Sequence, residues 1–328
     1  MFPVRYFPRR YYADDFFPAI GAAAAAVQAA EATKVISFVH IGYWNRWVKT
    51  DECTTGTTVT PSSEATDHDG DQTLSSQLSR TWRSTGLSGQ FLSGNLGNAY
   101  HIGAVALVKH NLTPAATVRV RISPVANFAT TVFDQTWNAW RNMYSATELA
   151  KGKIGEFFDT DGIPLQGTID NILQNPVFFL TFTELTGTYV RFDFTDASNP
   201  DGFIEVGAVY VGAMKTLDPN VSYGWQLYRD HIARTPNASN GEIWSGSVFR
   251  RTHLVGQVTA QSEADSKDFW FFVSFLRGQT RPIFVIWRDD LNSIRLYGTL
   301  WCKFASAPTL THYAIKRYSI PFEFEELL

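Results

Sequence analysis

The stretches "HIGAVALVKHNL" (residues 101–112) and "ATVRVRIS" (residues 116–123) decide the fold class of this 328-residue chain. The first is an almost continuous apolar run, which is typical of a strand buried on both faces. The second alternates valine and isoleucine with Arg119 and Arg121, so one face is expected to be buried and the other wet. The pair predicts two β-strands joined by a short turn.

Other segments with strand-like composition lie on both sides of this pair. They are "KVISFVHIGYW" (34–44), "PVFFLTFTEL" (176–185), "TYVRFDFTD" (188–196) and "FIEVGAVYVG" (203–212). The chain also has 25 Phe, 13 Tyr and 10 Trp, and aromatic side chains pack well on pleated sheets. Between residues 126 and 174 the periodicity fails, so we expect insertions there rather than strands. The fold class is therefore predicted to be mainly β.

The loop-like stretch after Gly212 marks a domain boundary. We predict an extended aromatic and basic arm with an Ala-rich segment at 1–33, a β-sandwich at 34–212 and a second β-rich domain at 213–328. The second domain is expected to contain one short helix, with Ser266 as its cap and Gly278 as its stop.

Strands are predicted on both sides of that helix. Residues 245–260 are interpreted as two strands, and residues 281–301 as a hairpin about an Asp-Asp-Leu-Asn turn. The last strand, "YSIPFEFEEL" (318–327), contains Pro321, which cannot donate a ladder hydrogen bond. We therefore expect that strand at an edge or a bulge.

Composition excludes several classes of function. The net charge is −3 and the arginines are scattered, so no basic surface is expected to bind nucleic acid. The two cysteines, Cys53 and Cys302, are far apart and have no second thiol at metal-ligand spacing, so we expect both to be reduced. The Ala-rich stretch at residues 19–34 is too short to cross a bilayer. It is interpreted as a short buried or docking helix rather than a secretory signal, and no membrane insertion is expected.

No catalytic motif is present in the sequence. It lacks the nucleophile elbow, the dinucleotide and phosphate loops and the His-Glu-x-x-His motif. We therefore predict that the protein is not an enzyme and needs no cofactor. Asp67, Asp69 and Asp71 alternate across a glycine turn and are candidate calcium ligands, although we prefer a solvated polar loop.

Two dipeptides are candidate ligand contacts. Trp82 and Arg83 combine a ring that could stack on a sugar with a forked donor. His110 and Asn111 follow a buried strand, where the chain must turn. Each has a structural alternative: Trp82 lies in the core with Arg83 bonded to a loop, and Asn111 bonds to the backbone of its own loop.

The arm "FPVRYFPRRYYADDFFPAI" (2–20) repeats an aromatic residue every five positions, which suits neither a strand nor a helix. Its prolines hold the chain extended, so its aromatic side chains need another surface. That surface is a neighbouring subunit or the flank of the same chain. The predicted docking residues are Phe2, Arg5, Phe7, Arg9, Arg10, Tyr12 and Phe17.

These motifs together resemble a known family. Trp82-Arg83, Leu96-Gly97, "HNL" at 110–112, "ATVRV" at 116–120 and "DGFIEVG" at 201–207 resemble the discoidin-like (galactose-binding-like) jelly-roll domains in structural proteins of tailed bacteriophages. The arm resembles the starts of small phage virion proteins, and the C-terminal region resembles β-rich assembly domains of tail-tip proteins.

The resemblance implies a distal-tail-like component of a tail tip or baseplate, assembled in the cytoplasm of the host bacterium and carried in the virion. Its implied partners are further copies in a ring-like homo-oligomer and other tail proteins, such as the tail tube, tape-measure or hub proteins. The alternative is a receptor-binding tail protein that recognises a host surface glycan through discoidin-domain loops, for which residues 50–79 are the best candidate.

Overall fold

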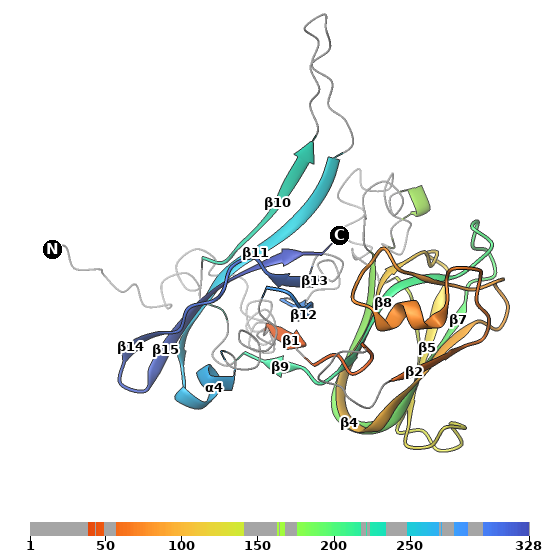
Figure 1. Cartoon of the computed structure of the whole chain (residues 1–328), viewed down its shortest axis with the longest axis horizontal. Coiled ribbons are helices and arrows are strands. Elements are labelled where there is room, and N and C mark those ends of the chain that lie inside the picture. The colour runs from red at the N-terminus through yellow and green to blue at the C-terminus, as the bar shows by residue number, and fades with distance from the viewer. Residues whose placement is uncertain are drawn as a thin grey trace, which may run out of the picture. The chain divides into compact units, whose positions relative to one another are not determined.

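A computed structural model provides the structure of this chain. It describes residues 39–42, 44–48, 57–140, 163, 165–167, 176–217, 221, 224–233, 248–268, 270, 279–287 and 298–327. The predicted arm and the Ala-rich segment lie outside these residues. The prediction of a mainly β fold is confirmed, because two antiparallel sheets dominate the described part of the chain (Figure 1).

Within the described residues, the first sheet contains seven strands. They are β2 (Thr58–Pro61), β3 (Trp82–Arg83), β4 (Phe91–His110), β5 (Thr117–Ser123), β6 (Phe133–Asn138), β7 (Val177–Thr195) and β8 (Glu205–Gly212). Their order is β3-β8-β4-β7-β5-β6, and β2 pairs with the start of β4. A 3-10 helix, η2 (Gly70–Leu74), lies between β2 and β3.

The two longest strands allow this sheet to curl around a core. The register of β4 against β7 shifts between Asn95 and Tyr100 and again between Ile102 and Ala104, and such irregularities bend strands. Inward side chains from both halves of β4 and β7 then meet in one apolar cluster, with Trp47 and Trp82 fully buried in it. The predicted sandwich core is therefore present, and we refer to this part as the sandwich.

The continuous apolar run of β4 has a simple cause. Val105 and Leu107 enter the sandwich core, whereas Ala104 and Ala106 face the opposite way. That second face joins a separate cluster with Phe284 and Trp301 of the other sheet. Small alanines allow this close approach, so residues 102–108 of β4 are buried on both faces as their sequence predicts, whereas residues 97–99 of the same strand are exposed.

The second sheet contains eight strands in the part of the chain that the structure describes. They are β1 (His40–Gly42), β9 (Lys215–Thr216), β10 (Gln226–Ala233), β11 (Val248–Gln261), β12 (Ile283–Ile286), β13 (Thr299–Phe304), β14 (Thr311–Ala314) and β15 (Arg317–Glu326). The order is β10-β11-β15-β13-β12-β1-β9, with β14 paired to β15. β12 pairs antiparallel with β13, as expected for the two strands of the hairpin predicted at 281–301, while its Asp-Asp-Leu-Asn turn lies outside the described residues. The chain thus begins this sheet at β1, builds the whole sandwich and returns at β9, so the predicted range 34–212 includes a strand of the second sheet.

Several local predictions were wrong. A strand, β6, lies in the region where none was expected, because five of its six side chains are exposed and leave no alternating pattern. Residues 248–261 form one strand rather than two. The helix α4 spans Glu263–Asp268, so Ser266 lies within it and does not cap it, while Gly278, the predicted stop, lies outside the described residues.

The last strand was predicted to lie at an edge or a bulge, and the edge alternative was wrong, although the β11–β15 register has an irregularity close by, between Val258 and Gln261. β15 lies inside the sheet, between β11 and β13. Pro321 pairs with Gln257 of β11 on one side. On the other side it falls between Ser319, which pairs with β14, and Phe324, which pairs with β13. The proline therefore occupies the one stretch where that side of the strand has no described ladder partner, and its missing N–H breaks no pairing there.

Candidate functional site

The two predicted dipeptides come together at one end of the sandwich. β3 and the end of β4 flank β8, and Glu205 of β8 contacts both neighbours. The Nε and Nη2 atoms of Arg83 both donate to Glu205 Oε2, at 3.0 and 2.6 Å, and the guanidinium lies 4.2 Å above the ring of Phe203. Asn111 Oδ1 accepts a hydrogen bond from the Glu205 backbone at 2.7 Å. Glu205 thus links two residues that are distant in the sequence.

Asn111 bonds to a different loop from its own. Its Nδ2 donates to Phe203 O at 3.0 Å and to Asp201 Oδ2 at 2.9 Å. Asn199 Nδ2 returns a hydrogen bond to the Asn111 carbonyl at 2.9 Å. These bonds hold the loop after β7 against the loop after β4. The side chains of Arg83 and Asn111 are therefore already hydrogen-bonded within the protein. A ligand role for either residue stays a prediction.

Trp82 and His110 are buried. The Trp82 ring is fully buried in the core, and its Nε1 donates to Ser63 O at 2.9 Å. His110 is 4% exposed and meets Trp140 edge-on at a centroid distance of 5.3 Å. A ligand at the surface would therefore not reach either ring without rearrangement.

The imidazole of His110 is held in its neutral form. Burial lowers its pKa from the ordinary 6.5 to about 3, because the charged ring would lose its hydration. Its Nδ1 accepts from the Leu112 backbone at 3.3 Å. Within the described residues, Nε2 has no hydrogen-bond partner.

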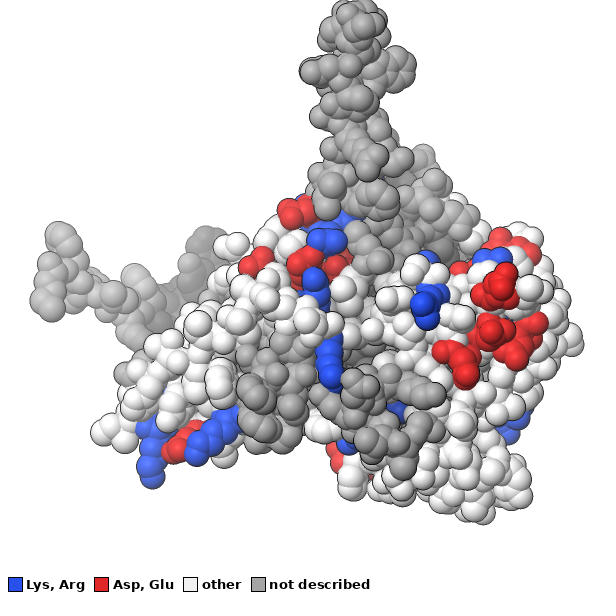
Figure 2. Space-filling model, in the orientation of Figure 1, with Lys and Arg blue, Asp and Glu red and all other residues white. Residues whose placement is uncertain are grey.

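The acidic loop before η2 is a surface feature. Asp67, Asp69 and Asp71 are all exposed, and acidic side chains gather in the region of η2 in Figure 2. No group of three potential metal ligands occurs among the residues that the structure describes. Calcium binding by these three residues stays an untested hypothesis, and the geometry adds no support to it.

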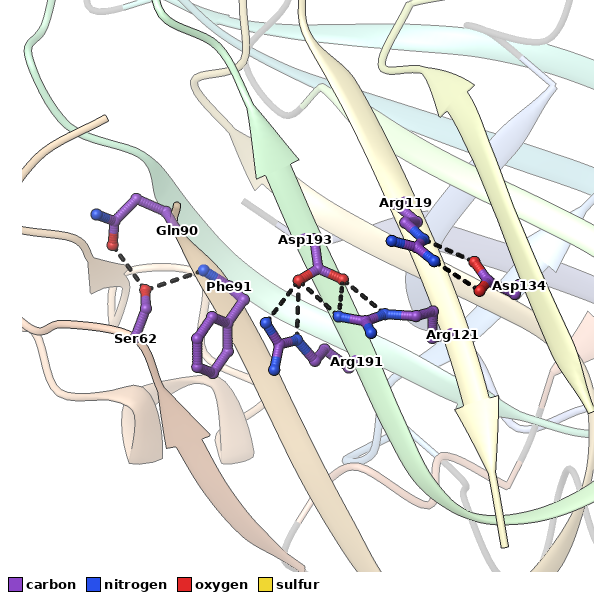
Figure 3. A network of polar contacts seen from close by, with 8 residues as sticks. All are labelled: Ser62, Gln90, Phe91, Arg119, Arg121, Asp134, Arg191 and Asp193. Atoms are coloured by element: carbon purple, nitrogen blue, oxygen red, sulfur yellow. Dashed lines mark hydrogen bonds and ion pairs between the residues drawn. The ribbon is translucent and has the colours of Figure 1, made fainter. Parts of the chain in front are cut away.

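An arginine–aspartate ladder, missed as a site in the sequence, runs across the wet face of β5, β6 and β7 (Figure 3). Arg121 and Arg191, which are direct cross-strand partners, both donate to Asp193. Arg119 forms a two-bond pair with Asp134 at 2.7 Å for each bond. The alternation of arginine in β5 and "RFD" in β7 could have suggested it. Three arginines share two aspartates, so all five side chains are engaged with one another while the ladder keeps one net positive charge.

A two-stranded ribbon extends from the second sheet. β10 and β11 pair without a break from Gln226↔Val255 to Ala233↔Val248, whereas the pairing of β11 with β15 begins only at His253. Residues 248–252 of β11 therefore pair with β10 alone within the described structure. Figure 1 shows these two strands leaving the body of the sheet.

Comparisons with known proteins find likeness of structure only. No family model and no curated protein sequence matches the chain. One similar solved structure is chitosan-binding module 1 of a chitosanase/glucanase from Paenibacillus sp. IK-5, at 19% identity and a TM-score of 0.33, covering 52% of this chain and 99% of that one. Another is the family 32 CBM of NanJ from Clostridium perfringens in complex with galactose, at 16% identity and a TM-score of 0.31, covering 47% and 92%.

The described helices include none with the length and apolar character needed to cross a membrane.

Proposed function

We propose that the protein is a structural component of a bacteriophage tail tip or baseplate, which forms a homo-oligomer and docks on neighbouring tail proteins. The sequence resemblance suggests the setting, in the virion after assembly in the bacterial cytoplasm. The ribbon of β10 and β11 carries the structural argument. An isolated two-stranded hairpin is only marginally stable in water, so a ribbon that leaves its sheet gains most from a partner surface. The predicted docking surfaces are then the arm, the sandwich edges and this ribbon.

The native mass of the purified full-length protein tests this proposal. One variant lacks residues 1–20. A second replaces residues 229–252 with Asn-Gly, which removes the part of the ribbon beyond the β11–β15 pairing and joins the cross-strand partners Tyr228 and His253 through a two-residue turn. We expect each change to lower the native mass or to prevent incorporation into particles. A control with Ile315→Ser, at an exposed hairpin turn, should leave both unchanged. Wild-type behaviour of both deletion variants would rule the proposal out.

Glycan binding by the sandwich is a second candidate function. It is favoured by the exposure of Glu64, Thr66 and the three aspartates in the predicted 50–79 segment, since hydroxyl and carboxylate groups can bind sugar hydroxyls. A glycan array probed with the full-length protein should then give signals that disappear with Asp67→Ala and Asp69→Ala. An array without signal would exclude this candidate.

A further inference from the structure

An open hollow of about 310 Å³ lies where β4 and β7 of the sandwich meet β1 and β9 of the second sheet. This volume is at the lower end of the range that is usual for small-molecule sites. None of the residues singled out in the sequence lines it. The hollow is therefore separate from the loop end of the sandwich and from the ribbon.

A local irregularity in β7 builds the hollow. Ile102 pairs with Leu185 and Ala104 pairs with Thr181, so three residues of β7 stand opposite Gly103 alone. The extra residues make β7 bulge, and bulges often redirect side chains at binding sites. Phe182 and Glu184 belong to the bulge and line the hollow.

Gly103 lines the hollow without a side chain of its own. A Cβ at this position would lie 3.7 Å from Met214 N and 3.9 Å from Phe182 O, which is ordinary contact without overlap. The absence of a side chain is therefore not required to avoid a clash. A glycine inside a strand can instead mark a close approach by another group, and here it faces the hollow.

The lining combines an aromatic ring with hydrogen-bonding groups. The ring of Phe182 stacks on Phe133 at a centroid distance of 4.5 Å, and both rings pack against the sandwich core. Glu184 is half exposed, and its Oε1 lies 3.1 Å from His101 Nδ1. A carboxylate can accept further hydrogen bonds. Two threonine hydroxyls complete the set: Thr181 is exposed, and Thr216 lies 3.0 Å from His40 Nδ1.

We propose that this hollow binds one hexose or hexosamine unit. A sugar ring offers hydroxyl or amine donors for Glu184 and for the threonine oxygens, and its C–H face packs on an aromatic ring such as Phe182. The carboxylate disfavours an anionic ligand, because like charges repel. This inference does not depend on the proposed assembly function, since neither the arm nor the ribbon contributes to the hollow.

Calorimetric titration of the full-length protein with glucosamine, N-acetylglucosamine and galactose tests the inference. At least one sugar should bind, and Glu184→Gln should weaken it by about tenfold, as expected for loss of a hydrogen bond to a charged group. Phe182→Ala should weaken binding to a similar extent. Gly103→Val should abolish binding, because the valine side chain would occupy part of the hollow. The control His101→Gln keeps every lining group and should change the affinity less than about twofold.

Three results would overturn the inference. They are no binding of any of the three sugars, unchanged binding in both Glu184→Gln and Gly103→Val, and loss of binding with Asp67→Ala while the hollow variants bind normally. The last result would instead support glycan binding by the acidic loop. Melting curves identify any variant that fails to fold, and Glu184, being half exposed, is the variant least affected by that problem. A wild-type native mass in the arm and ribbon variants would remove the assembly proposal and leave this one standing.

Discussion

At the scale of single residues, burial decides what a polar side chain can do. His110 and Trp82 both follow the sequence signals for ligand contacts, yet both rings are buried. Arg83 and Asn111 lie nearer the surface, but both are hydrogen-bonded to Glu205: Arg83 donates to its carboxylate, and Asn111 Oδ1 accepts from its backbone N–H. The burial of Trp82 was predictable from its apolar ring. The role of Glu205 was not, because its partners lie far away in the sequence and only the sheet brings them together.

His110 should make stability depend on pH. Its pKa is lowered from 6.5 to about 3 by burial, so the unfolded chain binds more protons than the folded one below pH 6.5. The contribution of neutral His110 to the free energy of unfolding is fully present above about pH 6.5. It is lost as the pH falls towards 3. At about 1.4 kcal/mol per pH unit, the free energy of unfolding should drop by about 3 kcal/mol between pH 6.5 and 4 from this residue alone.

Denaturant unfolding at both pH values measures this effect. The His110→Gln variant should show a smaller difference between the two pH values than the wild-type protein, which separates His110 from carboxylates that titrate in the same range. His101→Gln, at a side chain that is 73% exposed, should behave as the wild type does. An unchanged difference in His110→Gln would contradict the assignment.

At the scale of elements, strands with a buried face were the predictable ones. The burial of β4 and β5 could be predicted from their sequences. An apolar run indicates a strand buried on both faces, and an alternation indicates which face meets the core. β6 has no apolar run or alternation that would indicate a buried face, since nearly all of its side chains are exposed. The bulge in β7 was also invisible, because its register depends on β4 rather than on its own residues.

The close packing of β4 on Trp47 gives a prediction for this element. A Cβ on Gly94 would overlap the Trp47 ring, which is fully buried and hydrogen-bonded through Nε1 to Thr73 Oγ1 at 3.0 Å. Gly94→Ala should therefore lower the free energy of unfolding by about 1–3 kcal/mol, as overpacking does.

Denaturant unfolding followed by tryptophan fluorescence measures this loss. Gly86→Ala is the matched control, because no atom lies within 4 Å of the added methyl group. It should stay within about 0.5 kcal/mol of the wild type. Equal stabilities for the two variants would mean that Trp47 does not pack on Gly94.

At the scale of the whole described body, the two sheets share a core. Phe284 of β12 stacks on Tyr210 of β8 at 5.4 Å and also lies 6.3 Å from Phe179 of β7. All three rings belong to one buried cluster that includes residues of both sheets. The domain boundary predicted near residue 212 stays a prediction, and nothing in the sequence indicated that residues of the two sheets would share a common core.

Phe284→Ala tests whether this shared core couples the two sheets. It should destabilise the protein by about 3–5 kcal/mol and split one cooperative unfolding transition into two. Phe192→Ala removes an equally buried ring from the sandwich core alone. Calorimetry should show a lower midpoint but a single transition for that control. A single transition in Phe284→Ala would show that the junction does not hold the sheets together.

The pairing of β1 with β9 and β12 has a consequence for the order of folding. During synthesis β1 leaves the ribosome before the sandwich, yet its longer partner, β12, is made long after it. Closing so large a loop is entropically costly. Once the sandwich has folded, its two ends hold His40 opposite Thr216, so the loop still to be closed to Ile286, the partner of His40 in β12, runs from residue 216 instead of from residue 40. The folded sandwich would then hold β1 beside β9, and the second sheet would form only after the sandwich is complete.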